Sequence, residues 1–214
     1  MITLLTLYIT RHGETVWNTQ KRMQGWSDSE LTDNGVKDAV SLGKRIKDVD
    51  FVSIYSSPSN RTQMTASLIQ GNRDIPILLD DNLREINMGD WEGNTISFIE
   101  NMYPEEYYSF WNTPHLYRSH KGESFYDLRH RVMKFLCNIQ EKYTSGNILI
   151  VTHAVVIKTL LAFFKNYPLE RLWEPPFIHG TSLTKIELNE GEYNIAMEGD
   201  FLHECKEREM LNND

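Results

Sequence analysis

The chain has 214 residues, of which 40% are hydrophobic and 24% are charged, and its 30 acidic and 22 basic side chains give a formal charge of −8. This length can bury a substantial core, and the negative charge argues against non-specific binding to nucleic acid or to an anionic membrane. No stretch reaches the roughly 18 apolar residues of a membrane span, and the apolar first ten residues lack a basic segment, so a cytoplasmic protein is expected.

Short apolar or β-branched runs predict six strands. They lie at residues 4–10, 51–56, 76–79, 147–152, 182–188 and 193–198. The first, second and fourth runs are almost continuously apolar, which is typical of strands that are covered on both faces.

Helical patterns alternate with these strands. Capping residues and apolar spacing predict four long helices, which begin after Thr32, near Pro58, after Ser124 and after residue 153. Gly71 is expected to end the second helix. The third helix carries Cys137, one of only two cysteines, and its apolar pattern predicts that this thiol is reduced and buried. The alternation predicts an α/β fold whose largely parallel sheet carries helices on both faces.

Residues 92–123 interrupt this alternation. They are rich in aromatic residues and contain two prolines, so we expect a helical insertion that forms a lid rather than a separate domain. The predicted organisation is therefore one domain over residues 1–201, followed by a charged tail over residues 202–214.

Histidines directly follow two of the predicted strands. The sequences LYITRHGE, which contains His12, and LIVTHAVV, which contains His153, both run from an apolar strand through threonine to histidine. If these strands are parallel neighbours, both histidines emerge at the same edge of the sheet, where ligands bind in doubly wound folds. One such histidine alone is more often structural, but two in matching contexts favour a functional site. Gly13 is expected to let the backbone turn sharply beside His12.

Two further loops supply charged groups at strand ends. Arg61 lies about one turn into the helix after residues 51–56, and Glu85 lies in a loop after residues 76–79. Alone, each fits an ordinary surface or paired charge. Together with Arg11 and the two histidines, they form a residue set suited to a phosphoryl group. Arginine matches phosphate oxygens, imidazole can attack phosphorus, and a carboxyl group can protonate the leaving oxygen and then activate water.

Other kinds of site fit the sequence less well. It contains no GxxxxGK[ST] phosphate loop and no GxGxxG dinucleotide motif. His115 and His120 lack the cysteine pair or HExxH motif of a zinc site, so no metal or other cofactor is expected. The aromatic residues of the insertion have few basic neighbours, which favours a pocket wall or helical core over nucleic-acid binding.

Six segments together resemble the histidine phosphatase superfamily, also called the phosphoglycerate mutase-like family. They are RHGETVWN (11–18), RMQGWSDSELTDNG (22–35), YSSPSNRTQMTA (55–66), LREINMGDWEG (83–93), GES (122–124) and VTHAVVIKTLL (151–161), in the family's order. The resemblance implies a three-layer α/β/α sandwich around a mostly parallel mixed sheet. It also implies that His12 is the nucleophile and Glu85 the proton donor, with no metal. The implied phosphate pocket consists of Arg11, Arg61 and His153, and the implied loop that closes over the phosphate contains Thr15, Asn18, Gln24 and Gly25.

The family contains phosphatases and phosphoglycerate mutases, which share the residues around the phosphate. A mutase needs a second cationic patch for its bisphosphate, whereas the insertion offers only Arg118 and Lys121, beside His120. We therefore expect a metal-independent phosphatase that acts on small phosphomonoesters through a phosphohistidine, with Arg118 and Lys121 as candidate substrate-binding residues. The alternatives are a sugar bisphosphatase, a phosphatase of cofactor or nucleotide metabolism, a cofactor-dependent phosphoglycerate mutase and a non-catalytic phospholigand-binding protein. The expected assembly is a monomer or a homodimer.

Overall fold

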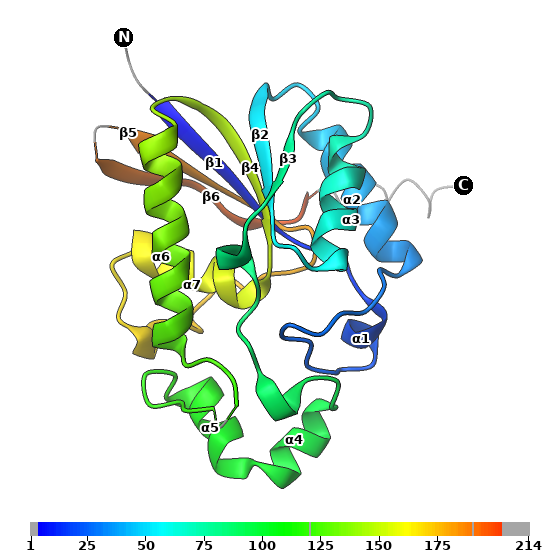
Figure 1. The fold of residues 1–214 in the computed structure, drawn as a ribbon, viewed down its shortest axis with the longest axis vertical. Helices are drawn as coiled ribbons and strands as arrows, with labels where there is room; N and C mark the ends of the chain where they lie inside the picture. The colour runs from blue at the N-terminus through cyan, green and yellow to red at the C-terminus, as the bar shows by residue number, and fades with distance from the viewer. Residues whose placement is uncertain (1–3, 120, 190, 203–214) are drawn as a thin grey trace.

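The computed structural model describes residues 4–119, 121–189 and 191–202, which form a mixed six-stranded sheet between two layers of helices (Figure 1). The strands are β1 (Leu4–Arg11), β2 (Phe51–Ser56), β3 (Ile77–Leu79), β4 (Gly146–Thr152), β5 (Leu183–Asn189) and β6 (Glu192–Asp200). Their order is β3-β2-β4-β1-β5-β6, with β1 to β4 parallel and β5 antiparallel to both of its neighbours. All six predicted strands are confirmed. Of the predicted tail, only residue 202 is described, and His120 also lies outside the described residues.

Helices cover both faces of this sheet. They are α1 (Val16–Thr19), α2 (Asp33–Arg45), α3 (Asn60–Gln70), α4 (Ile96–Met102), α5 (Pro104–Asn112), α6 (Phe125–Lys142) and α7 (Ala154–Phe164). In Figure 1, α2 and α3 lie on one side of the sheet and α6 and α7 on the other. Ile148 and Ile150 of β4 pack with α6 and α7, whereas the alternate residues Leu149 and Val151 pack with α2 and α3. The three-layer α/β/α fold is confirmed, and within the described ranges no helix has the length and apolar character needed to cross a membrane.

Local sequence signals set the helix ends. Thr32 and Ser124 cap α2 and α6 with their side-chain oxygens, as predicted. Helix α3 begins later than predicted, because Ser59 is its N-cap and Pro58 therefore precedes the helix instead of lying in its first turn. Gly71 ends α3, in agreement with the sequence.

The thiol of Cys137 is exposed on α6, so the prediction that it is buried is wrong. The buried stripe of this helix includes Val132, Leu136 and Ile139. Successive helical residues are rotated by about 100°, so a residue that directly follows Leu136 points away from the stripe. The apolar run misled the prediction because neighbouring residues in a helix cannot all face the core.

Helices α4 and α5 confirm that the insertion at residues 92–123 is helical, and they lie apart from the sheet (Figure 1). Phe110 of α5 joins them to the rest of the molecule, because its ring lies 5.0 Å from that of Phe125 and 5.3 Å from that of Trp173, centroid to centroid. The indole N–H of Trp173 also donates to the Phe110 carbonyl (2.6 Å). The extent of the single domain, residues 1–201, stays a prediction.

Candidate active site

Two neighbouring strands carry His12 and His153 to the same edge of the sheet. Strands β1 and β4 are parallel and pair Arg11 with Thr152. His12 directly follows Arg11, and His153 directly follows Thr152. The backbone N–H of His12 donates to the Thr152 carbonyl (2.9 Å), and the centroids of the two imidazole rings are 5.3 Å apart. The predicted pairing of these two histidines is confirmed.

The orientation of His12 determines which ring nitrogen can react. Its Nδ1 lies 2.8 Å from the Gly13 carbonyl oxygen, which can only accept, so Nδ1 carries the proton and Nε2 keeps its lone pair when the ring is neutral. The side chain is buried, and this burial together with the charges of Arg61 and Arg11 holds the pKa of His12 well below its ordinary value of 6.5. The ring is therefore neutral at pH 7, with Nε2 as its nucleophilic atom.

Gly13 serves close backbone packing rather than the sharp turn that we expected. Its φ lies outside the left-handed region, but a Cβ at this position would lie 2.5 Å from the Gly35 carbonyl oxygen. A Cβ on Gly35 would in turn lie 2.2 Å from the Glu14 carbonyl oxygen. The segment after His12 and the start of α2 therefore touch backbone to backbone.

We expect Gly13→Ala to lower the free energy of unfolding by about 2 kcal/mol, because the added methyl group would push these two segments apart. Urea unfolding followed by circular dichroism measures the loss. A loss of less than about 0.5 kcal/mol, the usual range for a substitution without a packing effect, would contradict the packing argument.

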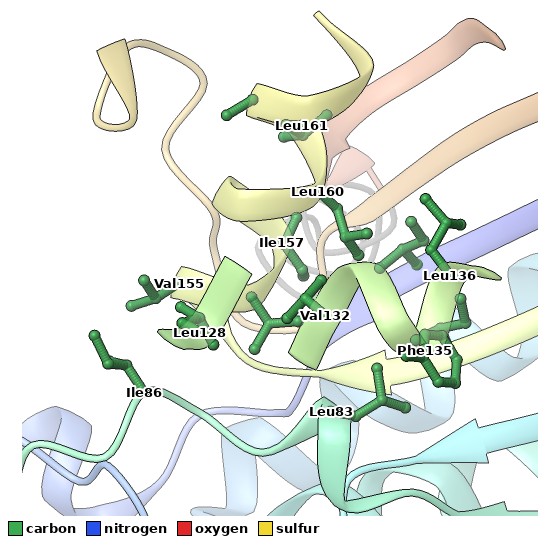
Figure 2. Packing of buried hydrophobic residues seen from close by; sticks show 14 of the residues in the cluster. Leu83, Ile86, Leu128, Val132, Phe135, Leu136, Val155, Ile157, Leu160 and Leu161 are labelled. Atoms are coloured by element: carbon green, nitrogen blue, oxygen red, sulfur yellow. The ribbon is translucent and has the colours of Figure 1, made fainter. Parts of the chain in front are cut away.

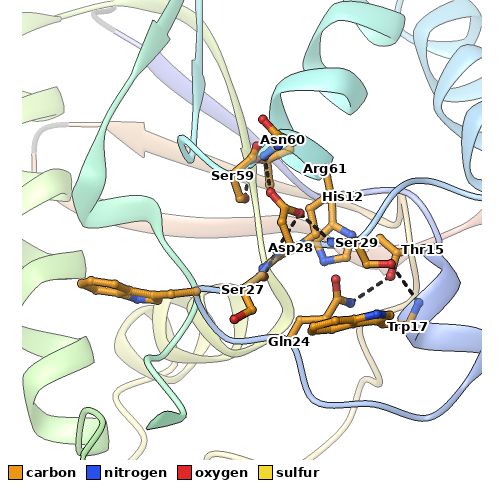
Figure 3. A network of polar contacts seen from close by, with 12 residues as sticks. His12, Thr15, Trp17, Gln24, Ser27, Asp28, Ser29, Ser59, Asn60 and Arg61 are labelled. Carbon is orange, nitrogen blue, oxygen red and sulfur yellow. Dashed lines mark hydrogen bonds and ion pairs between the residues drawn. The ribbon is translucent and has the colours of Figure 1, made fainter. Parts of the chain in front are cut away.

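Arg61 is buried at the start of α3 and is held by the loop that joins α1 to α2 (Figure 3). Its Nη1 donates to the Ser27 carbonyl (2.7 Å) and to Asp28 Oδ1 (3.0 Å), and its Nη2 donates to the Gly25 carbonyl (2.8 Å). The other oxygen of Asp28 accepts from the backbone N–H of Asn60. The protein itself therefore fixes the direction of this guanidinium.

His153 lies behind Arg61 and is not among the residues that line the cavity. A guanidinium can only donate, so His153 Nδ1 accepts from Arg61 Nη2 (3.1 Å), and Nε2 carries the proton and donates to Ser57 Oγ (2.8 Å). Burial, followed by the charge of Arg61, holds the pKa of His153 well below 6.5. In this arrangement neither ring nitrogen offers a proton to a phosphate oxygen, although the family resemblance places His153 in the phosphate pocket.

Glu85 follows a 3-10 helix at Asp81–Leu83 and lines the same cavity as His12. Its Oε1 accepts from the backbone N–H of Ile86 (2.9 Å), and its Oε2 accepts from that of Val155 (3.2 Å) in the first turn of α7. Burial raises the pKa of Glu85 above its ordinary value of 4.5, although these two N–H groups oppose the shift. A carboxyl group with a raised pKa is suited to donate a proton within the cavity.

The cavity has a volume of about 310 Å³, and its lining combines polar and apolar residues. Besides three cations that are described below, the polar members are Arg11, His12, Asn18, Gln24, Gly25, Arg61 and Glu85. The apolar members include Met23, Met88, Ile96, Phe110, Trp111, Trp173, Phe177 and Ile178. Such a lining can bind a ligand that carries both an anionic group and an apolar group. In the described part of the chain, no three His, Cys, Asp or Glu residues are grouped so that they could hold a metal ion.

Three of the four predicted loop residues, Asn18, Gln24 and Gly25, line this cavity, whereas Thr15 does not. The hydroxyl oxygen of Thr15 instead accepts from Gln24 Nε2 (2.9 Å; Figure 3) and from the backbone N–H of Asn18 (3.2 Å). Thr15 therefore lies outside the cavity and fixes the positions of two residues that line it.

Arg118 and Lys121, which the sequence suggested as substrate-binding residues, do not line the cavity. Arg118 donates to the carbonyl of Tyr117 (2.8 Å), and Lys121 forms an ion pair with Asp90 (3.1 Å). The structure therefore does not bring these two cations to the phosphate-binding residues.

Three cations that were not predicted as site residues also line the cavity, namely Lys21, Arg22 and Lys158. Lys158 left a recognisable signal, because it is the only charged residue in the run VVIKTLLAFF. Its ammonium group donates to the carbonyls of Glu174 and Pro176, which precede the apolar wall at Phe177.

The sequence and the structure of this chain are both similar to those of known phosphatases and phosphoglycerate mutase-like proteins. A sequence profile of the histidine phosphatase superfamily (branch 1) matches residues 7–200. Phosphoserine phosphatase 1 of Hydrogenobacter thermophilus is 28% identical over 170 residues, covering 79% of this chain and 81% of that protein. A probable phosphoglycerate mutase GpmB of Yersinia pestis is 34% identical over 170 residues, covering 77% of each chain. The structure of YhfR from Bacillus stearothermophilus superposes with a TM-score of 0.91 and 48% identity, covering 94% of this chain and 99% of that chain.

Proposed function

The chain belongs to the histidine phosphatase superfamily, and on this premise we propose that it hydrolyses small phosphomonoesters through a covalent phosphohistidine at His12, without a metal ion. One observation carries the proposal. A neutral imidazole with a free Nε2 shares a cavity with Glu85, a buried carboxyl group of raised pKa. Binding a phosphoryl group would require neither a nucleophile nor a proton donor, so a non-catalytic role explains less of the site.

In the first step, Nε2 of His12 attacks phosphorus opposite the ester oxygen. The N–P bond forms as the P–O ester bond breaks, and Glu85 gives its proton to the departing oxygen. The guanidinium groups of Arg11 and Arg61 stabilise the charge on the remaining phosphoryl oxygens. Both of these arginines have a buried Nε that lacks a hydrogen-bond partner among the described residues, which supports a role in binding an anion.

In the second step, Glu85 is a carboxylate and takes a proton from the water molecule that attacks phosphohistidine. The new P–O bond forms as the N–P bond breaks, and His12 returns to its neutral form. The hydrogen bond from Nδ1 to the Gly13 carbonyl holds the ring in one orientation through both steps.

We assign His153 to holding Arg61 rather than to donating a proton. Its uncharged Nδ1 accepts from the guanidinium, and its Nε2 is fixed by Ser57. Asn18 and Gln24 line the cavity and would offer side-chain N–H groups to the phosphoryl oxygens. Asn18 Oδ1 accepts from the backbone N–H and the hydroxyl of Thr15 (both 3.1 Å), which leaves its amide nitrogen available, and Gln24 Nε2 uses one of its two N–H groups to bind Thr15.

The aromatic and aliphatic side chains in the cavity lining favour esters with an uncharged, apolar leaving group. A second phosphate would require several further cations. Lys21 lines the cavity and could supply one, but Arg118 and Lys121 lie elsewhere, and Arg22 donates to the Gly93 carbonyl (2.6 Å). Lys158 likewise donates to two backbone carbonyls. We therefore favour a phosphatase over a bisphosphatase or a mutase.

The hydrolase assignment is tested with p-nitrophenyl phosphate, with and without a chelator. We expect turnover that the chelator does not change. No turnover above that of the His12→Ala protein would refute the phosphatase, and loss of activity with the chelator would refute metal independence.

The mutase alternative is tested with 3-phosphoglycerate, with and without 2,3-bisphosphoglycerate. We expect release of phosphate that does not depend on the bisphosphate. Formation of 2-phosphoglycerate that depends on the bisphosphate and outpaces phosphate release would favour a mutase instead.

A further inference from the structure

Resting on the proposed role of Glu85, we infer that Arg131 and Glu123 form a clamp that positions Glu85 for proton transfer to the leaving group. Neither residue lines the cavity, so both act through Glu85 rather than on the substrate. Arg131 lies on α6, and Glu123 lies just before that helix. The side chains are 2.7 Å apart and largely shielded from solvent.

Arg131 binds the segment that leads into Glu85. Its Nη1 donates to the carbonyls of Asn82 (2.9 Å) and Arg84 (2.6 Å), and its Nη2 donates to the carbonyl of Glu85 itself (2.8 Å). One guanidinium therefore satisfies three backbone acceptors within four residues. The last two of these carbonyls belong to the peptide groups that flank the Cα of Glu85, so both peptide groups are fixed.

Glu123 binds the segment that leaves Glu85. Its carboxylate accepts from Arg131 Nε and Nη2 (both 2.7 Å), and its Oε2 also accepts from the backbone N–H of Asn87 (2.9 Å). The backbone N–H of Glu123 returns a hydrogen bond to the Asn87 carbonyl (2.8 Å). A single ion pair thus anchors the chain on both sides of Glu85.

Apolar packing places this loop but does not by itself aim the Glu85 side chain. Leu83 and Ile86 are buried in one cluster with Val132 of α6 and Val155 of α7 (Figure 2). Such contacts are not directional, whereas hydrogen bonds to backbone carbonyls fix the rotation of each peptide group. Proton transfer requires hydrogen-bond distance to the leaving oxygen, and a displacement of about 1 Å can cost roughly 100-fold in rate.

The test compares two esters of similar size, benzyl phosphate and p-nitrophenyl phosphate. Benzyl alkoxide is a poor leaving group that needs the proton of Glu85, whereas p-nitrophenolate leaves with little protonation. The ratio kcat/KM reports the first chemical step and so avoids the breakdown of phosphohistidine. We expect Arg131→Met to lower kcat/KM by about 10- to 100-fold for benzyl phosphate and by less than about 3-fold for p-nitrophenyl phosphate.

Two variants keep this test independent of folding defects. Glu123→Gln keeps the shape of the side chain and an oxygen for Asn87 but removes the charge, and Arg131→Lys keeps the charge but loses the forked donors. Both should show the same selective loss for benzyl phosphate, at a smaller size. Arg129→Met is the matched control, because Arg129 is an exposed arginine of the same helix. This substitution should leave kcat/KM for both esters unchanged. Urea unfolding verifies that each compared variant is folded.

Three outcomes are distinguishable. Selective loss for benzyl phosphate supports the clamp. Equal losses for both esters in folded variants, or no loss for either, overturn the clamp and leave the proposed phosphatase intact. Failure of the unmodified protein to hydrolyse either ester would instead overturn the proposed function.

Discussion

His12→Ala is expected to lower kcat/KM for p-nitrophenyl phosphate by at least about 10⁴-fold. The reason is that His12 supplies the lone pair that forms the N–P bond, and its Nδ1 is already committed to the Gly13 carbonyl. No neighbouring group replaces it, because the nitrogens of His153 face Arg61 and Ser57. Steady-state release of p-nitrophenolate by the purified variant measures the loss.

His130→Ala is the matched control for this experiment. His130 is an exposed histidine of α6, so its removal should leave kcat/KM within about twofold of the unmodified protein. Residual activity of His12→Ala within about tenfold of the unmodified protein would contradict the nucleophilic role.

Glu85→Gln has the second-largest expected effect, and that effect depends on the leaving group. For benzyl phosphate we expect kcat/KM to fall by about 10²- to 10³-fold, which is the usual contribution of a positioned general acid. For p-nitrophenyl phosphate we expect less than about a tenfold loss, because its leaving group needs little protonation. Equal losses for the two esters would argue against the acid role of Glu85.

The pH dependence of benzyl phosphate hydrolysis follows from the same carboxyl group. Glu85 must be protonated to act as the acid, and burial raises its pKa above 4.5, so kcat/KM should fall as the pH rises through that raised pKa. His12 must be neutral, and its lowered pKa keeps it so until the pH falls well below 6.5. In Glu85→Gln, kcat/KM for benzyl phosphate should no longer fall at high pH, but it should still fall at low pH where His12 becomes protonated. An unmodified enzyme whose kcat/KM for benzyl phosphate keeps rising with pH would contradict this assignment.

Much of the fold could be predicted because its signals are local. The apolar runs of β1 and β4 are continuous because both faces of these strands are covered, and Thr32 and Ser124 mark helix starts through their own side chains. The meeting of the two histidines also followed from the sequence, because parallel strands end at the same edge of a sheet.

The remaining features depend on contacts between residues far apart in the chain. His153 accepts from Arg61, and this contact, rather than any local motif, sets its tautomer. Arg118 was expected near the substrate, but its place depends on how the insertion packs. The ring of the neighbouring Tyr117 lies 5.7 Å from that of Trp91, and Arg118 donates to the Tyr117 carbonyl outside the cavity. Arg131 could not be singled out in a helix of ordinary charged pattern, because the backbone carbonyls that it binds lie in the loop around Glu85, more than 40 residues away.

The central claim, a covalent phosphoryl group on His12, is tested most directly by locating the phosphoryl group during turnover. Glu85→Gln should slow the attack of water while p-nitrophenyl phosphate still phosphorylates the enzyme, so the intermediate should accumulate. Samples are quenched at alkaline pH, because phosphohistidine is labile in acid, and their peptides are analysed by mass spectrometry. We predict a phosphoryl group on the peptide that contains His12, at a level approaching one per chain. A chain that stays unmodified throughout turnover, or that carries the phosphoryl group on another residue, would contradict the proposed mechanism.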